Sequence, residues 1–457
     1  MLFLIVVPQI YLIGSILVII SVTCLGSSFV ILNSFLPLLV SNHPSIQTHG
    51  NHGTQYSSSI ALETLSSGSR GLNPMGHDRQ NTDTAVGSPL AELASPAVGS
   101  RLNSTSPELQ LSNKISSKGV GLGYSAAVFI QCLCIILLFL LSKLSSPSSS
   151  PTFPLRLVLF LVGLCWFSFT IPSRLWLRNR PGPPLSSLVS RHGRNWRSCL
   201  DYIAFAWVSV WRTIKVAAKL RQVVIFLVAW FLLSDAIATV SGTAILFAKT
   251  ELKMATAAIA LLSVVATTSG ILGAFTWPIL SRRLGMKSNH TIIACIALFE
   301  IIPLYGLMGY LPFIKRWGIG GLQQAWEIYP LGFVHGFAMG GLSSYCRSFF
   351  GLLIPPGSEA AFYALYAITD KGSSAVGPSV VGAIVDSTGH MRAAFGFIAI
   401  LTVLPAPLIW LVDAERGRRD GLKMAEAIKA RKLGDSGSTT HVQESVEEAE
   451  GLLAHHD

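Results

Sequence analysis

Apolar segments long enough to cross a lipid bilayer recur from one end of the chain to the other, and no other feature constrains the fold as strongly. A transmembrane helix needs about 20 consecutive, mostly apolar residues. Only 12% of the 457 residues are charged, against about 25% in soluble domains. The predicted spans are residues 10–40, 119–142, 153–175, 222–248, 254–281, 290–313, 327–350, 360–388 and 393–412, with residues 1–8 as the end of one further span before the bend at Pro8. The sequence therefore predicts an all-α membrane protein with about nine full transmembrane helices and an N-terminal fragment, not a soluble enzyme.

Two connecting segments are too polar to lie within the membrane. Residues 42–118 are rich in Ser, Gly, Asn and Pro, and we expect a disordered loop because this composition cannot bury enough apolar surface to fold alone. Residues 176–221 contain a Pro/Gly turn and then an amphipathic stretch, 202–219, which we expect to lie along the membrane surface. The predicted units are a partial N-terminal helix bundle (1–175), the basic central loop (176–221), a C-terminal six-helix bundle (222–412) and a tail (413–457).

The basic residues predict the orientation of these spans. The net charge is +11, and residues 174–221 contain ten Lys or Arg against Asp201 alone. The other basic clusters follow after even numbers of spans, which places them all on one face, and by the positive-inside rule this face is the cytosol. A membrane protein oriented in this way accounts for the positive charge without a nucleic-acid partner. The sequons at Asn103 and Asn289 then lie in the cytosol and are expected to be unglycosylated.

Chemistry that needs a metal or a cofactor is not expected. The cysteines lie mostly in apolar segments, without the spacing of a zinc site or a disulfide framework. There is no P-loop, nucleophile elbow or paired-carboxylate arrangement outside the spans. The run from Gly119 to Gly123 opens an apolar span and follows no strand, so it does not predict dinucleotide binding.

Several motifs resemble those of a known transporter family. Residues 273–287, GAFTWPILSRRLGMK, resemble the cytoplasmic-loop motif of the major facilitator superfamily, although the acidic member of that motif is missing here. More specific stretches are similar to the fungal autophagy-related vacuolar amino-acid effluxers. These stretches are residues 33–40 (NSFLPLLV), 117–124 (SKGVGLGY), 230–243 (WFLLSDAIATVSGT), 347–357 (RSFFGLLIPPG) and 369–378 (TDKGSSAVGP).

The resemblance implies a major facilitator fold of twelve spans in the vacuolar membrane and export of amino acids released by autophagic breakdown, in support of survival under nitrogen starvation. In register with that family, the chain lacks the first two spans and most of the third. We expect the natural start to lie further upstream; the alternative is an incomplete, inactive product. Transport of another small solute, such as a sugar or a drug, is an alternative. A second alternative is a non-transporting membrane scaffold whose serine-rich loop recruits cytosolic partners.

Ionisable side chains inside spans mark transport pathways or buried pairs, because they are expensive in a membrane. Asp235 leads the candidates and shares a helix face with Thr239. Its carboxylate is expected to bind a substrate ammonium group or carry a coupled proton; the alternative is a structural partner for a lysine or a helix backbone. Asp370 and Lys371, with Ser373 nearby, could bind the two ends of a zwitterion, or simply form an ion pair near the membrane face.

Four further residues are predicted to line a cavity or a gate: Glu327, His335, Tyr345 and Arg347. Glu327 and His335 are expected in the lumenal half of their span, although a lone histidine is more often a packing residue.

Small residues recur every fourth position at Gly332, Gly336, Gly340 and Ser344. This pattern predicts either tight helix packing or a surface that slides during transport. Glu300 lies in a helix expected at the periphery, where a hydrogen-bonded or protonated role is favoured over substrate contact.

The C-terminal tail becomes acidic and contains residues 448–453, EAEGLL, which resemble an acidic dileucine signal. The expected partners are therefore small-molecule amino acids, the lipid bilayer and a vesicle-sorting adaptor at the tail.

Overall fold

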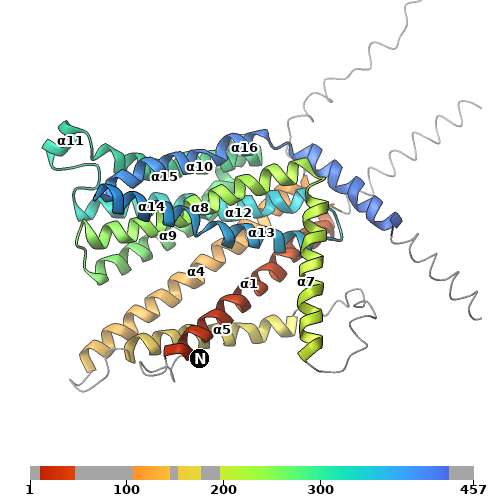
Figure 1. Ribbon diagram of the computed structural model, residues 1–457, viewed down its shortest axis with the longest axis horizontal. Coiled ribbons are helices and arrows are strands. Elements are labelled where there is room, and N and C mark those ends of the chain that lie inside the picture. The colour runs from red at the N-terminus through yellow and green to blue at the C-terminus, as the bar shows by residue number, and fades with distance from the viewer. Residues whose placement is uncertain (1–10, 47–106, 145–152, 177–195, 432–457) are drawn as a thin grey trace, which may run out of the picture.

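The computed structural model describes residues 11–46, 107–144, 153–176 and 196–431, and all regular elements within these ranges are helices (Figure 1). The N-terminal helices are α1 (Tyr11–Ser41), α4 (Pro107–Leu144), α5 (Phe153–Trp176) and α7 (Trp196–Ala217). The C-terminal bundle contains α8 (Arg221–Thr250), α9 (Thr256–Arg283), α10 (Ser288–Met308), α11 (Pro312–Trp317), η3 (Ala325–Glu327), α12 (Ile328–Leu353), α13 (Glu359–Ser373), α14 (Val376–Thr388), η4 (Met391–Ala393), α15 (Ala394–Val403) and α16 (Pro405–Leu411).

Seven of the described helical segments have the length and hydropathy of a membrane span: α1, α4, α5, α8, α9, α10 and the segment that joins η4, α15 and α16. The other two predicted spans are present in a different form. Helix α12 has 26 residues but includes five glycines, and the span predicted at 360–388 is divided into α13 and α14, of 15 and 13 residues. The structure confirms the predicted class, an all-α multi-pass membrane protein of the major facilitator type.

One end of the bundle, the basic end, carries Arg221 at the start of α8, Arg282 and Arg283 at the end of α9, and Arg416 beyond α16. Helix α7 lies at this end and runs across the direction of the long helices, as expected of a helix on a membrane surface (Figure 1). Helix α1 approaches the C-terminal bundle at the basic end and diverges from it toward the opposite end (Figure 1). Helix α4 follows α9 as far as the hydrogen bond of 2.6 Å from Gln131 to Ser263, and its last turns leave the bundle (Figure 1). The side chains of α1 follow this arrangement, since Asn33, Leu36 and Val40 are buried whereas most of residues 12–29 are exposed.

The core of the C-terminal bundle at the basic end is aromatic. Phe350 stacks with Phe226 and Tyr366, at centroid distances of 5.6 and 5.1 Å, and Tyr366 stacks with Trp230 at 4.6 Å. These contacts join α8, α12 and α13 into one rigid unit, because stacked aromatic pairs add stabilisation beyond the area that they bury.

The small-residue ridge of α12 lies directly against α9. A Cβ atom added to Gly336 would overlap the carbonyl oxygen of Ala266, and one added to Gly340 would overlap the backbone of Gly270. Close approach of two helix backbones is the known consequence of such a ridge in membranes. The structure therefore realises the predicted tight packing, while sliding during transport stays a prediction.

Two predicted boundaries were wrong. Residues 107–118, assigned to the disordered loop by composition, are the first turns of α4. Their polar side chains are bound by tertiary contacts, including a hydrogen bond from Asn113 Nδ2 to Ser288 Oγ of 2.9 Å and an ion pair between Glu108 and Arg418 of 3.1 Å. The predicted continuous span at 360–388 is divided after α13 because Pro378 has no N–H to donate to the carbonyl of residue 374 and its ring clashes there. The first turn of the second half bonds to α8, as described below. Predictions for residues 1–8 and 47–106 lie outside the described residues.

Candidate functional site

Asp235 lies near the middle of α8 and faces the break between α13 and α14. Its side chain is 2% exposed, and its Oδ1 accepts a hydrogen bond of 2.9 Å from the backbone N–H of Gly377 in the first turn of α14. The first N–H groups of a helix have no partner within the helix, and the helix dipole favours a negative charge at this end. Asp235 therefore caps α14 from a neighbouring helix. A Cβ atom on Gly377 would overlap Thr239 Oγ1, so glycine permits this close approach.

The last turn of α13 completes the polar cluster. Ser234 Oγ lies 3.0 Å from the carbonyl oxygen of Asp370 and 2.6 Å from its Oδ1, and Ser373 Oγ donates to the same carbonyl at 3.0 Å. Because α13 ends at Ser373, this carbonyl belongs to the last turn, which lacks helical donors. Lys371 Nζ pairs with Asp370 Oδ2 at 3.0 Å from a largely exposed position. Asp235 and Thr239 thus lie against the first turn of α14, while Asp370 and Ser373 lie in the last turn of α13 beside Ser234, and Lys371 points outward. Their part in transport stays a prediction.

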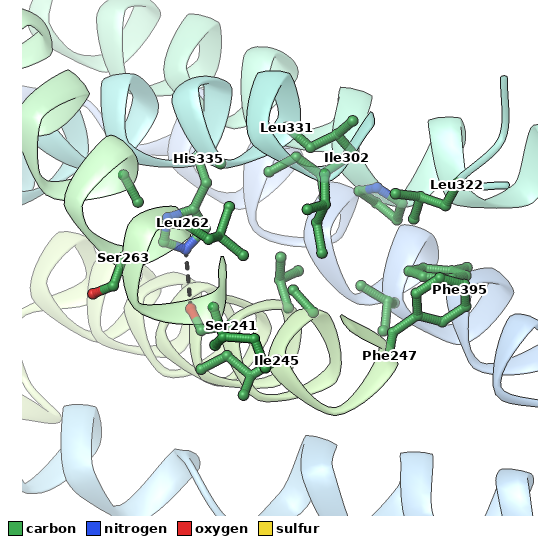
Figure 2. Close-up of a pocket in the computed structure, with 18 residues that line it drawn as sticks. Ser241, Ile245, Phe247, Leu262, Ser263, Ile302, Leu322, Leu331, His335 and Phe395 are labelled. Carbon is green, nitrogen blue, oxygen red and sulfur yellow. Dashed lines mark hydrogen bonds between the residues drawn. The ribbon is translucent and has the colours of Figure 1, made fainter. Parts of the chain in front are cut away.

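A cavity of about 220 Å³ lies between α8, α9, α10, α12 and α15, in the half of the bundle away from the basic end (Figure 2). His335 Nε2 lies 3.0 Å from Ser241 Oγ, and Ser241 donates its single proton to Ile237 O at 2.7 Å. The histidine is therefore expected to donate from Nε2. The polar lining residues are Ser241, Ser263 and His335, and the remaining walls are formed by Val240, Ala244, Ile245, Phe247, Ile259, Leu262, Ala266, Ile302, Pro303, Leu322, Ile328, Leu331, Gly332, Phe395 and Ile398.

Glu327 binds the loop at the end of the bundle opposite the basic end. Its carboxylate, 1% exposed as a residue, accepts hydrogen bonds from Tyr305 and from the backbone N–H groups of Gly320, Leu322, Gln323 and Gln324, at 2.8 to 3.3 Å. Leu322 has a positive φ of 61°, which is costly for a side chain with a Cβ. The carboxylate thus fixes a turn that is unfavourable by itself.

Arg347 joins α12 to the N-terminal helices α1 and α4 near the basic end. Its guanidinium donates to Asn33 Oδ1 of α1 at 3.0 Å and to Ser116 of α4, with Nη2 2.9 Å from Ser116 Oγ. Tyr363 Oη donates to the backbone carbonyl of Arg347 at 3.0 Å. Arg347 therefore lies at a contact between the N-terminal helices and the C-terminal bundle, and its part in a gate stays a prediction.

Tyr345 lines a second cavity of about 520 Å³ between α4 and the turn that joins α9 to α10. Lys114 and Arg282 contribute positive charge to its wall. Glu300 is buried in α10, and its Oε2 has no hydrogen-bond partner. In the part of the chain that the structure describes, no three His, Cys, Asp or Glu side chains are placed to hold a metal ion.

A multi-pass helical bundle, with polar side chains buried between its spans and a second set of helices attached mainly at one end, defines the class of membrane transporter. Residues 1–422 match the family described as vacuole effluxer Atg22 like. The chain belongs to this Atg22-like vacuole effluxer family.

Individual relatives agree with this membership. The chain is 60% identical to autophagy-related protein 22-1 of Aspergillus clavatus over 461 residues, which cover 99% of this chain and 72% of that protein. It is 58% identical to autophagy-related protein 22-2 of Neosartorya fischeri, with 99% and 73% covered. It is 56% identical to autophagy-related protein 22 of Botryotinia fuckeliana, with 100% and 74% covered.

Sequence reasoning missed Asn33 and Ser116 as partners of Arg347, and Ser241 as the partner of His335. The available signal was an amide or hydroxyl group inside an apolar span, but such residues are too frequent to single out without the packing. Of the two sequons, Asn289 lies in the first turn of α10 at the basic end. Asn103 and the tail segment 448–453 lie outside the described residues.

Proposed function

We propose that this protein exports amino acids from the vacuole lumen to the cytosol through the vacuolar membrane, and so supports survival when nitrogen is scarce. The observation that carries the proposal is the match of residues 1–422 to a vacuole effluxer family. The basic end faces the cytosol, as the positive-inside rule requires. Transport proceeds by rocking of the two helix sets about a site between them.

The arrangement of α1 and α4 supports this mechanism. Both helices are bonded to α12 near the basic end, through Asn33 and Ser116. Toward the other end α1 diverges from the bundle (Figure 1), and α4 keeps a hydrogen bond to α9, from Gln131 to Ser263, before its last turns leave the bundle. This is the shape of a transporter closed toward the cytosol. Export requires that these contacts break and that the opposite end closes.

The polar cluster at the α13–α14 break and the cavity beside His335 lie on different faces of α8, and each supplies one feature that suits an amino acid. Asp235 provides a buried carboxylate for a substrate ammonium group. The cavity of about 220 Å³ exceeds the volume of about 150 Å³ that suffices for benzene in a protein core, so a small apolar side chain fits. Aliphatic amino acids are therefore the preferred cargo.

Efflux from isolated vacuoles tests the proposal. Vacuoles from a strain that lacks the family protein are compared with vacuoles that carry this chain, after loading with labelled leucine or labelled glucose. We expect leucine to leave faster when the chain is present, while glucose efflux is unchanged. Equal leucine efflux in both strains would refute the amino-acid assignment, and faster glucose efflux would favour transport of another solute.

Delivery to the vacuole through the acidic dileucine segment 448–453 is a separate proposal. Replacing Leu452 and Leu453 by alanine should move a fluorescently tagged chain away from the vacuolar membrane if a sorting adaptor reads this segment. Unchanged vacuolar fluorescence would show that the segment is not needed.

A further inference from the structure

The junction of α1, α4 and α12 contains a half-buried arginine, Arg347, whose positive charge has no acidic partner. A guanidinium has five N–H donors, and four hydrogen bonds are formed by that of Arg347, to Asn33 Oδ1, to Ser116 O and twice to Ser116 Oγ. All these acceptors are neutral. The ion pairs among the described side chains join Lys371 to Asp370, Arg416 to Asp413 and Arg418 to Glu108, and none includes Arg347.

An unsatisfied N–H donor of Asn33 lies beside this charge. Because arginine only donates, Asn33 must present Oδ1 to Arg347, and its Nδ2 is left to face elsewhere. Asn33 is 4% exposed, and its Nδ2 has no hydrogen-bond partner. A buried donor without an acceptor is unfavourable. The cluster therefore has a surplus of donors from two side chains in direct contact.

A carboxylate is the ligand that this surplus fits. It offers two oxygens with about four acceptor positions, and its charge-assisted hydrogen bonds to arginine are roughly twice as strong as those of neutral acceptors. Arg347 is half-buried as a residue, so it is not fully enclosed by the three helices. The other anchors of the cluster, Ser116 and Ser344, are fully buried and bonded to each other, at 2.9 Å from Ser116 Oγ to Ser344 O.

We propose that Arg347 and Asn33 bind the carboxylate of the transported amino acid, and that this binding releases α12 from α1 and α4 at the basic end. The proposal rests on the proposed function, since it takes an amino acid as the cargo. The neutral oxygens of Asn33 and Ser116 hold Arg347 in the closed arrangement. A substrate carboxylate is a stronger acceptor than either and competes for the same donors, so it binds better once the contact is open and shifts the equilibrium to that state.

Asn33→Asp tests this inference directly, because it places a permanent carboxylate of the same size in contact with Arg347 Nη1. We expect the internal carboxylate to hold the basic end closed and to lower leucine efflux from vacuoles by about tenfold or more, the effect of one charge-assisted contact. Asn42→Asp is the matched control. It introduces the same group at an exposed position beyond the last turn of α1, nine residues from Asn33, where Asn42 bonds only the carbonyl of Leu38 and the neighbouring Ser41, and should keep most of the efflux.

Ligand binding to the purified chain provides a second measurement that does not depend on folding of the Asn33→Asp variant. Leucine should raise the melting temperature of the unmodified chain, whereas leucinamide, which has no carboxylate, should not. Arg347→Gln should abolish the leucine effect. The inference is overturned if leucinamide stabilises as well as leucine, or if Asn33→Asp exports leucine at the normal rate. If the unmodified chain moves no leucine at all, the proposed function itself fails and this inference with it.

Discussion

Replacement of Asp235 separates its contact with α14 from its negative charge. Asp235→Ala removes the acceptor of the Gly377 N–H, at a cost of about 1–2 kcal/mol for a lost helix cap. Asp235→Asn keeps an oxygen in the same place but makes the hydrogen bond neutral, a loss of about 1 kcal/mol. Since about 1.4 kcal/mol is a factor of ten in an equilibrium, the Gly377 amide should exchange roughly fivefold faster in the Asn variant, and about 5- to 30-fold faster in the Ala variant.

Hydrogen exchange of the purified chain, followed by mass spectrometry of a peptide spanning residues 374–380, measures these opening reactions. Leucine efflux measured on the same two variants reports the charge, and we expect both to lose export because neither has a carboxylate. Thr402→Val controls for removal of a buried hydroxyl that bonds only within its own helix. Unchanged exchange in Asp235→Ala would refute the capping role. Normal efflux in Asp235→Asn, with slightly faster exchange, would mean that the residue is a cap and takes no part in transport.

Other substitutions test the packing and the cavity. Gly336→Ala should force α12 away from α9, because the added methyl group overlaps Ala266 O. Size-exclusion chromatography of this variant should then show less monodisperse protein. The control Gly382→Ala, with open space around the added methyl group, should elute like the unmodified chain. Glu327→Gln puts an amide group among five donors and should destabilise the loop at residues 320–324 by about 3 kcal/mol. Limited proteolysis should then cut this loop faster than in the unmodified chain. Equal proteolysis rates would contradict the assigned contacts. His335→Phe removes the polar contact in the cavity, so the KM for leucine should change severalfold at normal protein abundance; an unchanged KM would place the substrate elsewhere.

Residues whose type or spacing is unusual within a membrane span were recognisable from the sequence. The cost of Asp235 in a membrane singled it out, and its contact with the first turn of α14 is one of the structural alternatives that its position predicted. The glycine repeat of α12 predicted a close helix contact, which is present with α9. The first turns of α4 were missed because Asn113 and its neighbours are polar by composition and become helical through contacts with residues distant in the sequence.

The sequence by itself determined the all-helical membrane class, the clustering of basic residues at one end and the short set of expensive polar side chains, because hydropathy, charge and helix periodicity are local properties of the chain. Only the tertiary structure decided that the first turn of α14 lies against Asp235 of α8. It also decided that Asn33, Ser116 and Arg347 meet, although 83 residues separate the first from the second and 231 the second from the third. Such contacts depend on how whole helices pack, and a single span carries no information about the neighbour that will satisfy its polar groups.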